Sequence, residues 1–200
     1  MFKRIITSIF LIALIFLIIF SSNIWIFALS ILLICFLGLY EWIKNSFSMI
    51  LVGLAIILNF GFWSIYFVSL DDDYIFLYGI IITNTVIFDT FAYLIGSKFG
   101  KRFIVKKISP NKTLEGLIGG LFAAGMFGMF IELMLFHALM HIFITGGIFA
   151  FIGDLVISYF KRKSGVKDTG NILPGHGGVL DRIDSHLFAT PALIYILLML

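Results

Sequence analysis

Residues 48–97 read SMILVGLAIILNFGFWSIYFVSL, then the triplet Asp71-Asp72-Asp73, then YIFLYGIIITNTVIFDTFAYLIGS. Each run beside the triplet exceeds the roughly 20 mostly apolar residues that a helix needs to cross a bilayer. Neither run shows the short alternating pattern of a membrane β-barrel strand. This stretch therefore predicts two transmembrane helices joined by a short acidic loop.

The rest of the chain has the same character. Hydrophobic residues make up 61% of the 200 residues and charged residues 12%, whereas a soluble domain averages about 45–50% apolar and about 25% charged. We therefore predict an all-α, polytopic integral membrane protein with about seven transmembrane helices. We divide a continuous apolar stretch near Phe136–His141, because about 45 residues suit two crossings. The remaining predicted helices cover 5–21, 24–40, 113–134, 138–160 and 185–200.

The basic residues predict the orientation. Every Lys and Arg falls at Lys3/Arg4, at Lys44, in 98–112 or in 161–182. With seven helices and a cytoplasmic N-terminus, all four places lie inside and the acidic triplet lies outside, in agreement with the positive-inside rule. Such cations also contact anionic head groups of the lipid bilayer. Because they sit in short loops between spans, we expect no nucleic-acid partner.

The candidate chemistry lies in residues 154–184, which read DLVISYFKRKSGVKDTGNILPGHGGVLDRID. Asp154, Ser158 and Lys161 are spaced to share one helix face, and a buried ionised Asp154 would cost about 2.5 kcal/mol or more unless it is paired, hydrated or metal-bound. Asp181 and Asp184, three residues apart, are expected on one face at the start of the last helix. Carboxylates beside a basic, glycine-rich loop suit Mg²⁺ and a polyphosphate.

A second group of residues supports this interpretation. Asp89, Tyr93 and Gly96 share the same spacing, and Asp89 is expected at a depth similar to that of Asp154. The segment that follows contains Ser109-Pro110, a pattern typical of a helix N-cap followed by proline at the first helical position. A helix starting there would offer free N–H groups to an anion.

The segment Ser158 to Asp184, called here the signature segment, resembles the signature of the phosphatidate cytidylyltransferases (CDP-diacylglycerol synthases). That signature is a Ser, then Lys-Arg, then Lys-Asp, His-Gly-Gly and Asp-Arg-x-Asp. The upstream SPNKTLEG resembles the family's SPKKTWEG, with Lys112 and Glu115 matching and Asn111 and Leu114 departing from it. The resemblance covers roughly residues 80–200. The matching residues of the signature segment are Ser158, Lys161, Arg162, Lys167, Asp168, His176, Gly177, Gly178, Asp181, Arg182 and Asp184.

The resemblance implies that CTP and phosphatidic acid react to give CDP-diacylglycerol and pyrophosphate. It implies Mg²⁺ on Asp154, Asp181 and Asp184, as one ion or a two-metal centre, with Asp89 as a further candidate ligand. It also suggests a homodimer, in a bacterial inner membrane with a cytoplasmic active site. The three metal-binding aspartates and Lys167 are the implied catalytic residues. The implied substrate-binding residues are Lys112, Ser158, Lys161, Arg162, His176, Gly177, Gly178 and Arg182.

The chain is interpreted as anchoring helices over 1–70 and a catalytic core over 71–200. Several alternatives stay open at this stage. Asp154 could pair with Lys161, Asp89 could bond Thr85 or Tyr93, and Asp168 could be a turn residue. His137 and His141 have metal-ligand spacing, with Glu132 nearby, but an interfacial or structural role is favoured. A cation transporter or channel using the intramembrane aspartates, or a cytidylyltransferase for another lipid phosphate, are the alternative functions.

Overall fold

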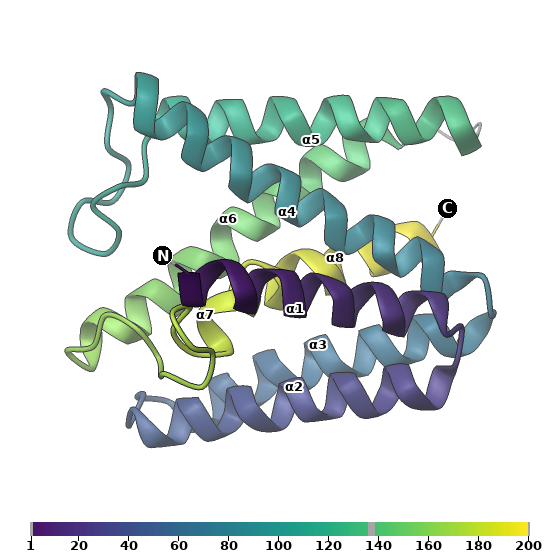
Figure 1. The fold of residues 1–200 in the computed structure, drawn as a ribbon. Coiled ribbons are helices and arrows are strands. Elements are labelled where there is room, and N and C mark those ends of the chain that lie inside the picture. Colours follow the sequence, from purple (N-terminus) through teal and green to yellow (C-terminus); the bar gives the residue numbers. More distant parts are fainter. Residues whose placement is uncertain (1, 136–138, 200) are drawn as a thin grey trace. The chain divides into compact units, whose positions relative to one another are not determined.

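The computed structural model describes residues 2–135 and 139–199, and these residues form helices and loops (Figure 1). No named strand occurs within them; isolated bridges join Phe103 to Thr113 and Leu173 to Gly177. The all-α prediction is therefore confirmed. The helices are α1 (Phe2–Phe20), α2 (Ile24–Lys44), α3 (Ile50–Leu70), α4 (Tyr74–Phe99), α5 (Leu114–Leu135), α6 (Met140–Lys163), α7 (Leu180–Ile183) and α8 (His186–Leu198).

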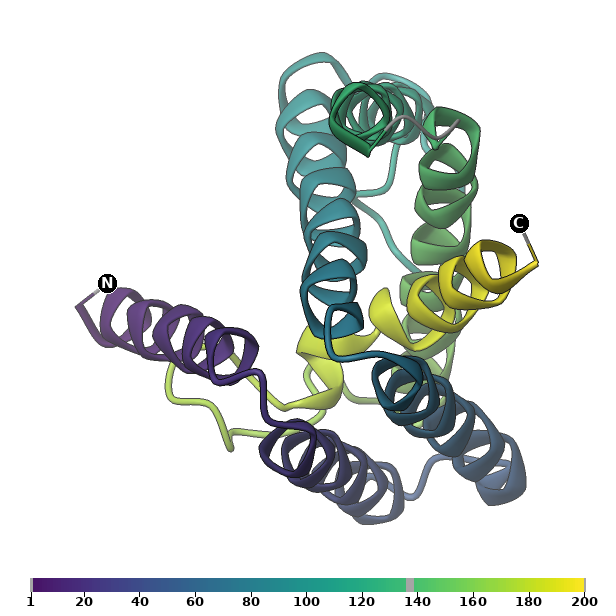
Figure 2. The same cartoon turned by 90° about the vertical axis from the view of Figure 1, so that its right-hand side faces the viewer.

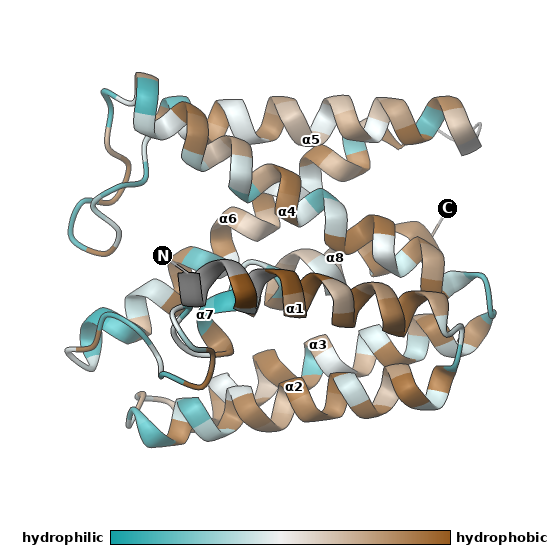
Figure 3. Ribbon diagram, viewed as in Figure 1, coloured by the Kyte–Doolittle hydropathy of each residue, from teal (hydrophilic) through white to brown (hydrophobic). Residues whose placement is uncertain are grey.

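Five helices in the described ranges, α2 to α6, are long and apolar enough to cross a membrane. Figure 3 shows their composition, since most of the ribbon of these helices has the colours of the hydrophobic side of the scale. Two shorter apolar helical stretches, Ile9–Phe20 and His186–Leu198, lie in α1 and α8. The chain is therefore an integral membrane protein. A count of about seven crossings and a cytoplasmic N-terminus remain predictions.

The chain packs as two compact units. Unit 1 contains Met1–Gly79 and Phe160–Ile183, and unit 2 contains Ile80–Tyr159 and Asp184–Leu200. Helices α4 and α6 therefore contribute residues to both units. Because this division rests on packing, the functional division at residue 70 remains a prediction.

Unit 1 is built on a hairpin of α2 and α3, which lie side by side in Figures 1 and 2. Small residues allow the close approach: Gly53 faces the Trp42 ring, and a Cβ on Gly61 would lie 2.8 Å from the Cys35 sulfur. The Trp42 ring packs on Phe160, with ring centroids 4.7 Å apart. Unit 1 thus places the end of α6 against the end of α2.

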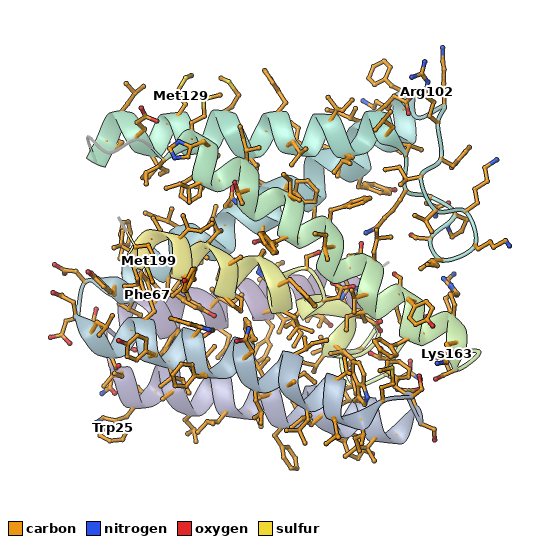
Figure 4. The ribbon with its side chains drawn as sticks, turned by 180° about the vertical axis from the view of Figure 1, so that it is seen from behind. Trp25, Phe67, Arg102, Met129, Lys163 and Met199 are labelled. Atoms are coloured by element: carbon orange, nitrogen blue, oxygen red, sulfur yellow. The ribbon has the colours of Figure 1, made fainter. Side chains whose placement is uncertain are left out.

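Within unit 1 the basic residues gather at one end of the α2–α3 hairpin, and the acidic triplet lies at the other end. The α2 end that carries Lys44 adjoins the cation-rich signature segment, while Asp71-Asp72-Asp73 follows the opposite end of α3. Figure 4 shows Lys163 and Trp25 at opposite ends of this unit. This separation agrees with the distribution of charge expected from the positive-inside rule.

In unit 2, α4 and α5 converge where the loop 100–113 joins them (Figure 1). A Cβ on Gly96 would lie 3.4 Å from the Gly116 Cα, so these backbones nearly touch. The Glu115 carboxylate accepts hydrogen bonds from the Lys101 and Arg102 N–H groups at 3.0 and 3.1 Å. These bonds close the loop onto the first turn of α5.

The predicted helix start at Ser109-Pro110 is wrong. Helix α5 begins at Leu114, and the Thr113 hydroxyl accepts a hydrogen bond from the Gly116 N–H at 3.1 Å. Thr113 is therefore the N-cap of α5, because the hydroxyl of an N-cap threonine accepts a hydrogen bond from the otherwise unpaired N–H three residues later. Ser109 instead lies in a turn, with its N–H donating to the Val105 carbonyl at 2.9 Å.

The division between the fifth and sixth helices is confirmed, since α5 ends at Leu135 and α6 begins at Met140. Glu132 accepts hydrogen bonds from the Leu139 and Met140 N–H groups at 3.2 and 3.4 Å. Glu132 thus caps α6, a structural role. His137 lies outside the described residues, and His141 is exposed on the first turn of α6.

Candidate active site

The α6–α7 loop of unit 1 (residues 164–179) is shaped by a tight turn. The Leu173 N–H donates to the Gly177 carbonyl at 3.0 Å, and the His176 N–H donates back to the Leu173 carbonyl at 2.9 Å. Gly175 and Gly177 have φ angles of +79° and +85°, which residues other than glycine rarely adopt. The glycines around His176 are therefore required by the backbone of the loop.

Asp181, in α7, accepts hydrogen bonds from α6 and from this loop. Its Oδ1 accepts a charged hydrogen bond from Lys161 Nζ at 3.0 Å. Its Oδ2 accepts from the Thr169 N–H at 2.8 Å and the Gly178 N–H at 3.0 Å. Burial acts to raise the pKa of Asp181, but the Gly178 N–H, the charge of Lys161 and the Thr169 N–H together hold that pKa below its ordinary value. Asp181 is therefore ionised near neutral pH.

A second carboxylate, Glu41 of α2, meets the same loop. Glu41 is fully buried, and its Oε1 accepts from the Val179 N–H at 2.9 Å. Its Oε2 accepts from the Leu180 N–H and the Thr169 hydroxyl, both at 2.8 Å. Glu41 is not among the site residues predicted from the sequence. The available signal was an acidic residue inside an otherwise apolar span, which is costly unless it has a role.

The other charged members of the signature segment lie on the surface of unit 1. Arg162, Lys167 and Asp168 are exposed. Arg182 is also exposed, and its guanidinium donates two hydrogen bonds to the His176 carbonyl at 2.9 and 2.7 Å. The arginine thus braces the turn that presents His176.

In unit 2, Asp154 forms an ion pair with Lys112 rather than with Lys161. The Lys112 Nζ to Asp154 Oδ2 distance is 2.7 Å, and the Ser158 hydroxyl donates to Asp154 Oδ1 at 3.0 Å. Lys112 also lies over the Phe151 ring, 4.5 Å from its centroid. The alternative pairing of Asp154 with Lys161 is therefore wrong, whereas the predicted shared face of Asp154 and Ser158 is confirmed.

Asp89 of α4 meets the α7–α8 turn through Ser185. The Ser185 hydroxyl donates to Asp89 Oδ1 at 3.2 Å, and the Ser185 N–H donates to Asp184 Oδ1 at 3.0 Å. A Cβ on Gly153 would lie 2.5 Å from the Asp184 carbonyl oxygen, so α6 touches this turn closely. The alternative partners of Asp89 are wrong: the Thr85 hydroxyl is buried without a hydrogen bond and Tyr93 is exposed.

Asp181 and Asp184 do not share a helix face as predicted, because α7 ends at Ile183 and Asp184 lies in the following turn. The predicted site residues thus form two groups, one in each unit. Unit 1 holds Lys161, Arg162, Lys167, His176, Gly177, Gly178, Asp181 and Arg182, and unit 2 holds Asp89, Lys112, Asp154, Ser158 and Asp184.

The carboxylates have the donor chemistry of a magnesium site, because Mg²⁺ prefers oxygen ligands. Among the described residues, however, no group of three or more His, Cys, Asp and Glu side chains lies close enough to hold a metal ion. Lys112 and Lys161 hold oxygens of Asp154 and Asp181. The residues therefore fit Mg²⁺ shared with substrate phosphates, rather than a preformed cage of protein ligands.

The described helices thus hold two lysine–aspartate ion pairs, Lys161–Asp181 in unit 1 and Lys112–Asp154 in unit 2. Residues 45–200 match the sequence profile described as "Cytidylyltransferase family". The chain belongs to this family.

Three relatives, each named phosphatidate cytidylyltransferase, illustrate the similarity. The protein of Bacillus subtilis is 38% identical over 170 residues, covering 78% of this chain and 61% of the relative. That of Staphylococcus aureus is 40% identical over 169 residues, covering 78% and 62%. That of Rickettsia bellii is 38% identical over 171 residues, covering 78% and 72%. The chain thus spans about three fifths of the length of the first two.

Proposed function

We propose that this protein transfers the cytidylyl group of CTP to phosphatidic acid, giving CDP-diacylglycerol and pyrophosphate. The observation that carries the proposal is the Lys161–Asp181 pair, whose atoms lie 3.0 Å apart inside the signature segment of a cytidylyltransferase-family chain. The pair fixes a cation of α6 and a carboxylate of α7 at the two ends of the loop expected to receive the nucleotide. The names of the relatives supply the substrates of the proposal.

In the proposed reaction a phosphate oxygen of the lipid attacks the α-phosphorus of CTP. A new P–O bond forms, and the bond between the α-phosphorus and the oxygen bridging to the β-phosphorus breaks, so that pyrophosphate leaves with the electron pair. The lipid phosphate is largely a dianion near neutral pH and needs little help from a base. The protein's work is therefore to bring two anions together and to neutralise their charge.

The lysines of the two ion pairs are suited to that work. Lys112 and Lys161 each lie against a carboxylate. When a phosphate binds, each lysine turns to the phosphate oxygens and releases a carboxylate oxygen of Asp154 or Asp181. Mg²⁺, when bound, supplies further charge neutralisation at the phosphates. Asp154, Asp181 and Asp184, with Asp89 as a further candidate, would hold one or two such ions.

The exposed cations serve the nucleotide in this proposal. Arg162, Lys167 and Arg182 contact its phosphates, while Gly177, Gly178 and His176 shape the loop around it. The N–H of Gly178 already donates to Asp181, so the glycine contributes shape rather than a free donor. Ser158 orients Asp154 through its hydroxyl.

The proposed setting is the inner membrane of a bacterium, with the N-terminus and the signature segment in the cytoplasm, α1 and α8 as additional spans, and a homodimer as the assembly. The gathering of Lys and Arg at the Lys44 end of the α2–α3 hairpin supports this orientation. Single cysteines at Lys44 and Asp72, labelled from each side of inverted vesicles, test it. The native Cys35 is buried and gives little background. Chemical crosslinking in the membrane tests the dimer.

The test of function uses the purified chain in detergent with labelled CTP, Mg²⁺ and phosphatidic acid. We expect equimolar CDP-lipid and pyrophosphate. Activity should fall at least about 10²-fold in Asp154→Asn, because Asp154 would hold the Mg²⁺ that neutralises phosphate charge, and such neutralisation is usually a large part of the rate. Asp72→Asn, an exposed carboxylate in the acidic triplet, is the matched control and keeps full activity.

Two results would contradict the proposal. Product formation with a polyprenyl phosphate but not with phosphatidic acid would move the chain to another lipid substrate. A wild-type protein that makes no CDP-lipid, yet passes a cation across liposomes without CTP, would replace the enzyme by a transporter.

A further inference from the structure

Glu41 is a buried carboxylate that lies outside both the signature segment and the family match over 45–200. Its side chain is fully buried, although it sits within one turn of the end of α2. A buried charge is unfavourable unless its hydrogen bonds are satisfied. Glu41 accepts three, all from residues of the α6–α7 loop or the first residue of α7. The burial of the Glu41 carboxylate is thus explained by hydrogen bonds from residues that lie more than 120 positions later in the sequence.

Thr169 connects Glu41 to Asp181. Its hydroxyl donates to Glu41 Oε2 at 2.8 Å, and its N–H donates to Asp181 Oδ2 at 2.8 Å. Its carbonyl accepts from Asn45 Nδ2 at 2.6 Å, and the same Asn45 nitrogen donates to the Glu41 carbonyl at 2.7 Å. Every polar group of Thr169 is therefore fixed, two by the α2 end and one by Asp181.

The start of α7 is held by the same two carboxylates. Three successive N–H groups point to them: Gly178 donates to Asp181, and Val179 and Leu180 donate to Glu41. Hydrogen bonds to charged acceptors are roughly twice as strong as neutral ones. Glu41 therefore fixes the backbone directly before Asp181 and so sets where the Asp181 carboxylate stands.

The loop backbone packs closely on the Glu41 side chain at two glycines. A Cβ on Gly170 would lie 2.8 Å from Glu41 Oε1, and a Cβ on Gly178 would collide with Thr169 Oγ1 and both Glu41 oxygens. The loop backbone thus rests directly on the carboxylate.

We propose that Glu41 is a positioning residue of the cytidylyl-transfer site: it holds Thr169 and the start of α7 so that Asp181 and Lys161 stand in the geometry that CTP requires. This inference rests on the proposed function. It gives α2, which the sequence marks only as an anchor, a part in positioning the reacting groups. Glu41 itself contacts neither substrate.

The main test variant is Glu41→Gln. Glutamine keeps the shape but has one acceptor oxygen, so its NH₂ group must face a donor, either Val179 N–H or the Thr169 and Leu180 donors. We expect kcat/KM for CTP to fall by about 10²-fold, as for a misplacement of about 1 Å, while KM for phosphatidic acid stays unchanged. Ser30→Ala, on the same helix with its hydroxyl donating to the Ile26 carbonyl, is the matched control and keeps wild-type kinetics.

A second pair of variants guards against a simple folding defect. Thr169→Val removes the hydroxyl but keeps the N–H bond to Asp181, and Thr169→Ser restores the hydroxyl. We expect the serine variant to exceed the valine variant by about 10-fold in kcat/KM for CTP, a difference equal to one hydrogen bond to a charged group. The effects of Glu41→Gln and Thr169→Val should be strongly non-additive, because one contact joins the two residues.

Hydrogen–deuterium exchange provides a readout that does not depend on activity. In Glu41→Gln the Val179 and Leu180 amides should exchange faster, while α3 keeps wild-type protection. If the wild type is inactive and Glu41→Gln shows this exchange pattern, the proposed function is overturned, while the hydrogen bonds from Glu41 to the start of α7 are supported. Unchanged amide exchange with unchanged kcat/KM for CTP in Glu41→Gln would overturn the role of Glu41. So would a loss of activity only in proportion to unfolded protein, with Thr169→Ser no more active than Thr169→Val.

Discussion

Substitutions of Lys161 and of Asp181 should lower the free energy of unfolding by different amounts, although the two residues form one ion pair. The exposed side-chain fractions are 11% for Lys161 and 7% for Asp181. A pair this desolvated differs from a surface salt bridge, which contributes about 0–1 kcal/mol. Removing one partner of a buried pair costs about 3–5 kcal/mol, because the other charge stays buried and uncompensated.

The partners that remain differ between the two substitutions. In Asp181→Asn, Lys161 loses its carboxylate and the new NH₂ group faces either the lysine or the two backbone donors. We expect a loss of about 3–5 kcal/mol in the free energy of unfolding. In Lys161→Met, Asp181 keeps the N–H groups of Thr169 and Gly178, and each such bond to a charged acceptor contributes about 1.5–3 kcal/mol. The loss should therefore be smaller, at about 1–2 kcal/mol.

The assay is equilibrium unfolding in mixed micelles with increasing sodium dodecyl sulfate, followed by tryptophan fluorescence, since Trp42 packs on Phe160 next to Lys161. In the double variant the two effects should fall short of their sum by about 1–3 kcal/mol. Equal losses in the two single variants, or additive losses in the double variant, would refute the reasoning that the backbone donors share the charge of Asp181.

Three further predictions follow from the same contacts. The lowered pKa of Asp181 in the folded protein contributes stability that is present above its ordinary pKa of about 4. This stability is lost as pH falls through the lower pKa of the folded state. Acid unfolding should show the loss in the wild type and not in Asp181→Asn. Gly170→Ala should destabilise by about 1–3 kcal/mol through overpacking, measured by the same micelle unfolding, and the loss should shrink in a Glu41→Ala background. Asp154→Asn should abolish CDP-lipid formation yet destabilise less than Asp181→Asn, because its pair with Lys112 is more exposed.

Helix type and helix position could be predicted well from the sequence, because bilayer thickness sets a length that apolar runs display directly. The start of α5 could not, since Ser109-Pro110 and Thr113 both have capping chemistry. The deciding factor is tertiary: the Leu114 N–H donates back to the Arg102 carbonyl at 2.8 Å, which places the first turn after Thr113. Local cap signals do not contain that contact.

The candidate site divides in the same way. The signature segment marked Lys161 and Asp181, but not that they pair with each other, because the partner of a charge depends on how a loop folds back. Lys112 and Asp154 form the corresponding pair in unit 2, again across a distance in sequence that spacing rules do not cover. Glu41 and Ser185 were missed since neither belongs to a motif. Only the contacts that they make reveal their roles.

The bonds at the start of α7 have a consequence for how the protein would respond to ionic strength. Because the N–H groups of Gly178, Val179 and Leu180 already donate to carboxylates, a polyanion arriving from water would meet exposed cations such as Lys167 and Arg182 first. Attraction at an exposed surface is screened within about 10 Å at 0.1 M salt. Added salt should therefore slow the capture of a polyanion, while the buried pairs that keep the loop folded hardly respond.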